Sequence, residues 1–437
     1  MVLDSEAADL IPTVKVYKRR WYILALFSLA TATQGGIWST WGPISKSAEV
    51  AFNWTQSDIA LLTSWGPIAY LISAPFLVWF MQFGLRYSQL ALTGVMTLGT
   101  MLRCINSNPP TFTYLAYSGQ IINGLVGPIA MSLSPLLSVI WFPLEERTLA
   151  TAISAVLNSA GTAASFLTGP LSIADPSKSN STSPLEIRKE IMYNMYAACG
   201  WTALLFLLSI CYFPSKPMIP PTASASSGIR RSFLKGLIML IKKDSLRFWL
   251  LAFPYGLSIG FFAAWTSVLD DIIPKHHLSE DAAGWLAFIG TISGQVAGLL
   301  MAKLADRFPN RMKEFLLSSY VIASVCCLLF CFNLVLWKFN VIVLYSSFIL
   351  AAICISSTVP LWIEMMSETA FPVDESSATG VATTINNATA AILLGILSKQ
   401  SLGVNWTSWA VLSSAVISIP FIIVFKPKDS RRFLDTA

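Results

Sequence analysis

Twelve long apolar runs, six on each side of one hydrophilic segment, dominate this sequence. A helix needs about 20 apolar residues to cross the hydrocarbon core of a bilayer, and these runs approach that length. They begin near Trp21, Asp58, Tyr87, Thr111, Thr148 and Ile191, and then near Phe248, Ala282, Phe315, Val341, Ser377 and Trp406. Only 12% of the residues are charged, well below the roughly 25% of soluble domains. We therefore expect an all-α membrane protein with 12 transmembrane helices.

The hydrophilic segment 214–247 divides the chain into two halves. It opens with the Pro- and Ser-rich stretch "SKPMIPPTASASSGIRRS" and then becomes basic, which is typical of a cytosolic linker. We expect six-helix bundles over 21–213 and 248–426, with cytosolic tails at 1–20 and 427–437. Two such bundles make up the major facilitator superfamily fold.

The basic residues and the glycosylation sequons agree on one orientation. With both termini in the cytosol, 21 of the 29 Lys and Arg residues fall on cytosolic segments and 8 on the other side. The sequons at Asn53, Asn180 and Asn405 then all lie on the non-cytosolic side, where glycosylation takes place. The sequon at Asn387 lies within a predicted helix, so we expect it to be unused.

The N-terminal tail contains a pattern that fits an acidic dileucine sorting signal. An acid, Glu6, precedes Leu10 and Ile11 at the required spacing. The pattern is short, but its place in a cytosolic tail suits recognition by sorting adaptors.

Two pairs of cytosolic loops are candidates for gating. In the second half, Gly298, Ala302, Asp306 and Arg307 form the spacing of a charged loop that joins neighbouring helices. The matching first-half loop keeps Arg86 but has Gln82 in place of the acid. A second pair is "WFPLEER", with Glu146 and Arg147, and "FPVDE", with Glu375. Their corresponding positions indicate an internal repeat.

Other classes of function find little support in the sequence. The seven cysteines fall in or beside predicted helices and show no CxxC spacing, and the only histidines are His276 and His277. We expect no cofactor and no metal. No phosphate-binding loop or nucleophile–base pair indicates an enzyme, and no basic face outside the membrane rims indicates nucleic-acid binding.

Several motifs together resemble solute carrier family 49. They are "WSTWGPISKSA", "SDIALLTSWGPIAYL", "GLR", "GQIINGLVGP", "WFPLEERTLATAI", "GFFAAWTSVLD", "DAAGWLAFIG" and "FPVDESSATGV". The resemblance extends through nearly all twelve predicted helices. It implies a lysosomal carrier that exports a small metabolite, with pyridoxine (vitamin B6) driven by protons as the expected solute. More distant members of the family, the feline leukaemia virus subgroup C receptor proteins, are choline and ethanolamine carriers also linked to haem.

The resemblance and the helix pattern together suggest a substrate site. Trp38 and Trp41 are three residues apart on one helix face, and Gln34 lies one turn before Trp38. In the choline-carrying relatives, a tryptophan matching Trp38 and a tyrosine of helix seven form an aromatic cage. Here we expect Phe262 to take the tyrosine position, with Trp265 one turn on. Trp38 and Trp41 could instead be residues of the interfacial aromatic belt.

Polar residues at membrane depth complete the expected site. Uncharged amides there can contact a solute or can bond between helices. The candidates are Gln120, Asn123, Asn158, Gln295 and Asn386. For proton coupling, the candidate carboxylates are Asp270, near the end of helix seven, and Glu364, in helix ten.

Two alternatives stay open at this point. A choline, ethanolamine or haem carrier at the plasma membrane differs from the main expectation in solute and location. A nutrient sensor or receptor built on a carrier fold differs in class, because it would bind its ligand without moving it across the membrane.

Overall fold

The fold consists of long helices joined by short turns. The computed structural model describes residues 15–174, 176, 183–219, 221, 246–273, 280–308, 311–335, 339–370, 375–397 and 404–426. These residues form α-helices, two short 3-10 helices and turns, and there is no strand among them. The predicted all-α fold is confirmed.

The helices follow one another in the order that the apolar runs predicted. Those of the first half are α2 (Arg20–Trp38), η1 (Gly42–Ile44), α3 (Ser45–Phe52), α4 (Gln56–Phe80), η2 (Met81–Phe83), α5 (Leu85–Leu102), α6 (Pro109–Leu125), α7 (Gly127–Trp141), α8 (Leu144–Ser172) and α9 (Pro184–Cys211). Those of the second half are α12 (Leu246–Ser267), α13 (Leu269–Ile272), α14 (Glu280–Arg307), α15 (Met312–Val335), α16 (Val341–Ser356), α17 (Val359–Ala370), α18 (Glu375–Leu397) and α19 (Trp406–Val424).

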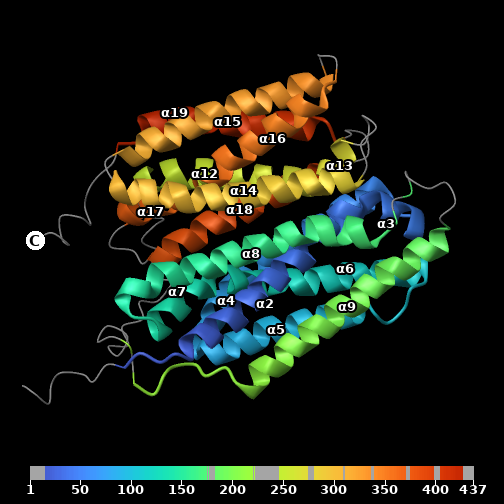
Figure 1. Cartoon of the computed structure of the whole chain (residues 1–437), viewed down its shortest axis with the longest axis horizontal. Coiled ribbons are helices and arrows are strands. Elements are labelled where there is room, and N and C mark those ends of the chain that lie inside the picture. Colours follow the sequence, from blue (N-terminus) through green and yellow to red (C-terminus); the bar gives the residue numbers. More distant parts are fainter. Residues whose placement is uncertain are drawn as a thin grey trace, which may run out of the picture.

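Nine stretches of the described chain are long and apolar enough to cross a membrane. The expected spans outside these nine are α2, α5 and the pair α6–α7, which lie beside them (Figure 1). α2 and α5 contain Thr, Gln and Gly, which lower their hydropathy. α6 and α7 are each short because one run is divided at Val126.

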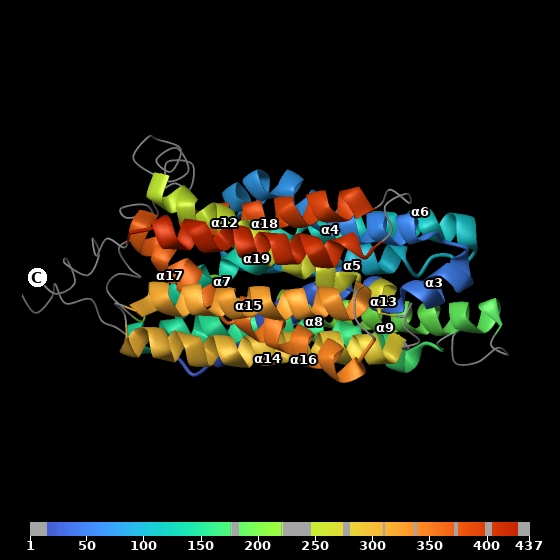
Figure 2. The same ribbon diagram turned by 90° about the horizontal axis from the view of Figure 1, so that it is seen from above.

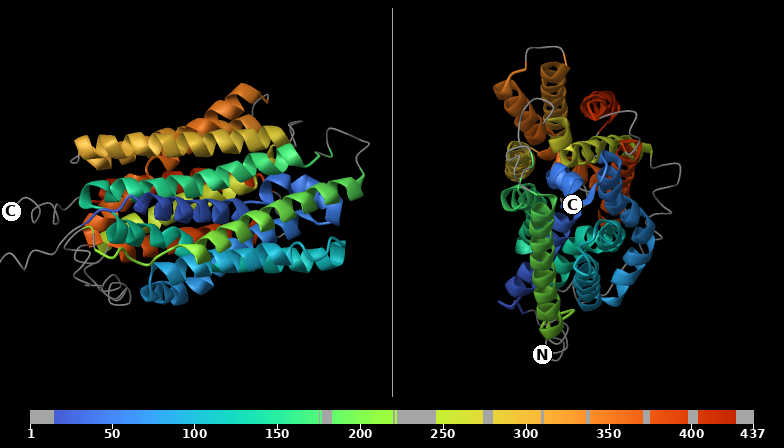
Figure 3. Two further views of the ribbon diagram at one scale, coloured as in Figure 1. Left: turned by 60° about the horizontal axis from the view of Figure 1, so that its bottom comes forward. Right: turned by 90° about the vertical axis from the view of Figure 1, so that its right-hand side faces the viewer.

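The helices of each half pack together, and the two groups lie side by side (Figures 1 and 3). The helices run along the long axis of the molecule, so the bundle has two ends (Figure 2). We call the end with Arg20 and Val424 the terminal end, and the end with α3 the α3 end. Between the halves, α8 packs against α14 and α4 packs against α18.

The buried cores show where the halves are joined. At the terminal end, each half has a hydrophobic core made only of its own residues. Toward the α3 end, the core of the second half also includes Ala60 of α4 and Phe166 of α8. The two halves therefore share a hydrophobic core toward the α3 end and keep separate cores at the terminal end.

Main-chain contacts close the bundle at the α3 end. A Cβ atom on Gly42 would overlap the carbonyl oxygen of Ser267, and one on Gly284 would overlap that of Phe166. The cavity left at this junction has a volume of only about 10 Å³ and is lined partly by Pro43. That is about the room for a single water molecule.

The fourth helix of each half is broken at a matching place. α6 ends at Leu125 and α7 begins at Gly127; α16 ends at Ser356 and α17 begins at Val359. In both cases proline is the second residue after the break, where its missing N–H is not needed. The matching breaks support the predicted internal repeat.

A cation at the start of the third helix caps the sixth helix in each half. Arg86 donates to the carbonyl oxygen of Ile210, at the end of α9, over 3.1 Å. Lys313 donates to the carbonyl oxygen of Ile423, at the end of α19, over 2.8 Å. The last carbonyls of a helix lack intrahelical partners and carry partial negative charge, so both contacts are stabilising. We call these two contacts the helix clasps.

Candidate functional site

Trp38 rests on two glycines. It is the last residue of α2, and its ring is half-buried. A Cβ on Gly66 of α4 would lie 2.6 Å from Cε2 of the ring, and a Cβ on Gly127 of α7 would lie 3.0 Å from Cζ3. No larger residue would leave the ring in this place. Three helices of the first half therefore fix the position of Trp38.

Two buried amides lie beside this ring. Gln34 and Asn123 each donate to the other's backbone carbonyl oxygen over 3.4 Å. Their side-chain oxygens, Oε1 of Gln34 and Oδ1 of Asn123, are buried and have no hydrogen-bond partner among the described residues. Buried acceptors without partners are costly, and in a transport protein they are candidates for contact with a solute. Both Gln34 and Asn123 are among the polar residues that the sequence places at membrane depth.

Two tyrosines extend the site toward the second half. Cδ2 of Tyr70, from α4, would lie 3.0 Å from a Cβ on Gly127, so Tyr70 flanks the same glycine as Trp38. Tyr255 of α12 lies close enough to Tyr70 to interact with it electrostatically across the two halves. Neither tyrosine was among the residues expected at the site. The available signal was a polar-tipped ring in an otherwise apolar helix.

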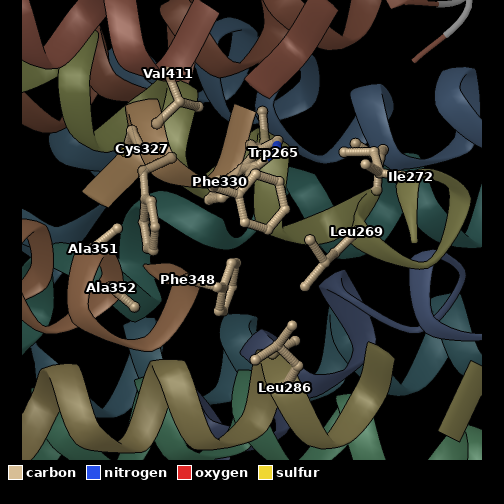
Figure 4. Packing of buried hydrophobic residues seen from close by; sticks show 14 of the residues in the cluster. Trp265, Leu269, Ile272, Leu286, Cys327, Phe330, Phe348, Ala351, Ala352 and Val411 are labelled. Atoms are coloured by element: carbon tan, nitrogen blue, oxygen red, sulfur yellow. The ribbon is translucent and has the colours of Figure 1, made fainter. Parts of the chain in front are cut away.

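Phe262 and Trp265 lie together in the core that the second half shares with α4 and α8. Their ring centroids are 6.0 Å apart, and the ring of Trp265 also packs 4.9 Å from that of Phe330. Nε1 of Trp265 donates to Oγ of Ser408 over 3.0 Å. Figure 4 shows Trp265 among the apolar side chains of this core.

Trp41 belongs to a packed aromatic cluster at the α3 end. It is 1% exposed, and its ring lies 5.1 Å from that of Trp54 and 6.1 Å from that of Phe112. Trp41 is therefore part of a hydrophobic core of the first half at the α3 end. Gln120 is also fully buried, and it donates from Nε2 to the carbonyl oxygen of Trp38 over 2.8 Å.

Asn158 and Asn386 occupy matching places in the two halves. Asn158 of α8 packs its backbone carbonyl against Gly35 of α2, and Asn386 of α18 does the same against Gly260 of α12. Nδ2 of Asn158 also donates to the carbonyl oxygen of Thr31 over 2.7 Å. Both asparagines therefore lie where two helices of one half cross closely. Gln295 is half-buried in α14.

The gating candidates make contacts within one half. Glu146, at the start of α8, accepts from Nε and Nη2 of Arg20 at 2.8–3.0 Å. Arg86 forms one of the helix clasps, and Arg307 is exposed with its guanidinium over the ring of Phe308. The side chains of Arg147, Asp306 and Glu375 lie outside the described part of the structure.

The two proton-coupling candidates lie in different helices of the second half, Asp270 in α13 and Glu364 in α17. The backbone of Asp270 lies in α13, next to η1 and α14 at the α3 end, while its side chain lies outside the described part. Glu364 is an exposed residue of α17. Among the residues that the structure describes, no group of His, Cys, Asp and Glu could hold a metal ion.

Two of the three expected glycosylation sites are exposed. Asn53 follows α3 in a left-handed conformation, with φ of 55°, and Asn405 directly precedes α19. Asn387, by contrast, is 5% exposed within α18. Asn180 and the sorting-signal residues Glu6, Leu10 and Ile11 lie outside the described residues.

The comparisons with known proteins agree with this architecture. The family model described as "Major Facilitator Superfamily" matches residues 23–393 and 257–434. A "Solute carrier family 49 member 4 homolog" from Xenopus tropicalis is 36% identical over 435 residues, covering 96% of this chain and 94% of that protein. The "Choline/ethanolamine transporter flvcr2b" from Danio rerio is 23% identical, covering 94% of this chain and 83% of that protein.

Solved structures show the same fold at low sequence identity. The xylose transporter XylE from E. coli, in a partially occluded inward-open conformation, has a TM-score of 0.66 and 14% identity. The match covers 94% of this chain and 98% of XylE. The expected arrangement of the major facilitator superfamily is confirmed.

Proposed function

Because this chain belongs to the major facilitator superfamily and, within it, to solute carrier family 49, it is a transporter and not an enzyme, and we propose that it exports a small organic metabolite from the lysosome. The proposed solute is pyridoxine, moved by alternating access together with protons. In this proposal both termini are cytosolic and the α3 end faces the lysosomal lumen. The distribution of Lys and Arg supports that orientation.

The observation that carries the proposal is the pairing of Trp38 with free acceptors beside it. The ring of Trp38 offers a flat surface for an aromatic solute, and such stacking contributes about 0.5–1.5 kcal/mol. The partnerless oxygens of Gln34 and Asn123 can accept hydrogen bonds. Pyridoxine is a flat ring with several hydroxyl donors, so it can use both features at once.

The second candidate solute is choline or ethanolamine. The similarity of this chain to a choline/ethanolamine transporter favours it. The rings of Trp38, Tyr70 and Tyr255 could hold a cation by cation–π contact. Choline, however, has a single hydroxyl and no N–H, so it would leave one of the two acceptors without a donor. Ethanolamine has N–H donors, but it has no flat ring to stack on Trp38. These differences make pyridoxine the first choice.

The solute is tested by uptake into vesicles that contain the purified protein. Labelled pyridoxine, choline and haem are compared for wild type, Trp38→Ala and Trp285→Ala; Trp285 is 43% exposed on α14 and serves as the matched control. We expect pyridoxine uptake that falls at least about tenfold in Trp38→Ala only, as for a central aromatic contact. Uptake of choline or haem alone would replace the proposed solute, and binding without uptake would indicate a sensor.

Proton coupling is tested separately. In the proposal, Asp270 exchanges protons at the α3 end, and uptake of pyridoxine increases with an inward proton gradient. Asp270→Asn should remove the dependence on the gradient, whereas Glu364→Gln, at an exposed position, should keep it. Uptake that ignores the gradient in wild type would remove protons from the mechanism.

The location is tested through the N-terminal tail. Replacing Leu10 and Ile11 with Ala should move the protein from lysosomes to the cell surface, because sorting adaptors would no longer bind the tail. A protein that stays in place after both changes would contradict the role of Glu6, Leu10 and Ile11.

A further inference from the structure

Arg103 is a cation buried inside the first half. It follows α5 directly and is 1% exposed. Arginine keeps its proton in proteins, so burial does not neutralise it. Among the described residues no carboxylate pairs with it, and its Nε has no hydrogen-bond partner. A buried charge of this kind is costly, and in a membrane protein it calls for a functional explanation.

The surroundings of Arg103 show what the charge contacts. Nη2 donates to Oε1 of Gln120 over 2.6 Å, and the guanidinium lies 5.8 Å from the centre of the Trp41 ring. A Cβ on Gly119 would lie 2.6 Å from Nε, so the side chain lies flat against that glycine. Gln120 and the ring of Trp41 are thus the two partners that stabilise the cation.

Gln120 connects Arg103 to the backbone of Trp38 by two hydrogen bonds. Its Oε1 accepts from Arg103 while its Nε2 donates to the carbonyl oxygen of Trp38 over 2.8 Å. This carbonyl is in the last turn of α2, where helix carbonyls lack intrahelical partners and carry partial negative charge. Only the side-chain amide of Gln120 therefore lies between the partial negative charge at the end of α2 and the guanidinium of Arg103. The end of α2 takes the place of a carboxylate as the counter-charge of this cation.

We propose that Arg103 is a positioning residue for the Trp38 site. Through Gln120 it holds the last turn of α2 in place and so keeps the ring of Trp38 on Gly66 and Gly127. Arg103 does not touch the solute; it sets the affinity by fixing the surface on which the solute stacks. The inference rests on the proposed role of Trp38 in solute binding.

The first test needs no solute. Hydroxyl-radical labelling, read by mass spectrometry, measures how exposed the ring of Trp38 is, with Trp285 as the internal reference. Arg103→Met and Gln120→Leu should each increase the labelling of Trp38 several-fold. The matched control is Arg188→Met. Arg188 also donates to a helix-end carbonyl, that of Ala51, and its guanidinium lies over the ring of Phe52. Both of these partners belong to α3 and not to α2.

The second test separates affinity from the amount of folded protein. At equal protein level, Arg103→Met should raise the KM for labelled pyridoxine about tenfold and leave Vmax within about twofold. Arg103→Lys keeps the positive charge but lacks the planar guanidinium, so its affinity for pyridoxine should lie between those of Arg103→Met and wild type. The double variant with Gln120→Leu should be no worse than the worse single variant, because both act through one contact.

The outcomes separate the two proposals. A Vmax that falls with protein amount, while KM and Trp38 labelling stay unchanged, would reduce Arg103 to a structural residue and overturn the inference. If Arg103→Met does not fold, unchanged Trp38 labelling in Gln120→Leu overturns it equally. If the variants increase Trp38 labelling but the wild-type protein does not transport pyridoxine, the positioning role of Arg103 is upheld and the proposed solute is removed.

Discussion

Gly42 and Ser267 meet main chain to main chain, from opposite halves of the molecule. There is no room for a Cβ atom between Gly42 and the carbonyl oxygen of Ser267, and Gly284 meets Phe166 in the same way. The α3 end is therefore closed by backbone contact, with a residual cavity of only about 10 Å³. In the proposed alternating access this contact has to form and break in each cycle, so it is a direct place to test the mechanism.

Alanine at Gly42 or Gly284 should prevent complete closure of the α3 end. Overpacking of this kind costs about 1–3 kcal/mol, which lowers the ratio of closed to open protein roughly 5- to 150-fold. We expect slower uptake and faster labelling of a cysteine placed at Thr266, next to the junction. Gly200→Ala is the control, because nothing lies within 4 Å of a Cβ at Gly200. Equal labelling in all three variants would contradict the closure.

Alanine at Gly127 should weaken solute binding by moving two rings at once. Its Cβ would lie 3.0 Å from atoms of both Trp38 and Tyr70, closer than ordinary van der Waals contact. We expect the KM for pyridoxine to rise several-fold at equal protein level. Gly395→Ala is the control, since its Cβ would meet no atom within 4 Å. A KM that stays the same in Gly127→Ala would mean that these rings do not shape the site.

Glutamine at Glu146 should destabilise the terminal end of the first half. The carboxylate accepts from two nitrogens of Arg20, and the two side chains are 32% and 12% exposed. Loss of such a charge-assisted pair costs about 1–3 kcal/mol. We expect a melting temperature several degrees lower. Glu314→Gln should have almost no effect, because its contact with Arg311 is 4.0 Å long and exposed.

Loss of either helix clasp should lower stability by a similar amount. Arg86→Met and Lys313→Met each leave helix-end carbonyls without their cation, and we expect about 1 kcal/mol of destabilisation in each case. Lys303→Met, at an exposed position of α14, is the control. A stability change in only one of the two variants would show that the clasps are not equivalent.

Glycosylation reports directly on the orientation in the membrane. Asn53 and Asn405 are exposed near the α3 end, so with that end in the lumen each can carry a glycan. Asn53→Gln, Asn180→Gln or Asn405→Gln should reduce the apparent mass by one glycan for each site in use. Asn387→Gln should leave it unchanged, because Asn387 is buried in α18. If no glycan is found on any of the three, the proposed orientation rests on the distribution of Lys and Arg alone.

The positions of the helices could be predicted from the sequence, because the bilayer imposes a minimum length on every span. The partnership of Gln34 with the Trp38 site also followed from helix spacing alone. The role of Tyr255 in α12 could not be predicted in this way. Tyr255 and Phe262 lie seven residues apart, about two turns along nearly the same face of an apolar helix, so the pattern does not favour one over the other.

The contacts of Arg103 and Arg86 depended on information that spacing does not contain. No motif marks Arg103, and only the packing of α5 against α6 brings it to Gln120. Arg86 resembled part of a latch between helices, but its partner Ile210 lies 124 residues further along the chain, at the end of α9. That helix end is not marked by any motif, so the contact could be found only in the folded chain.

The helix clasps at Arg86 and Lys313 join the third helix of each half to the sixth helix of the same half. Neither clasp crosses to the other half, so a change in the relative position of the halves leaves both contacts intact. Substitutions at the junction of the halves should therefore change the rate of transport, and those at the clasps should change thermal stability. The two properties can in this way be altered separately.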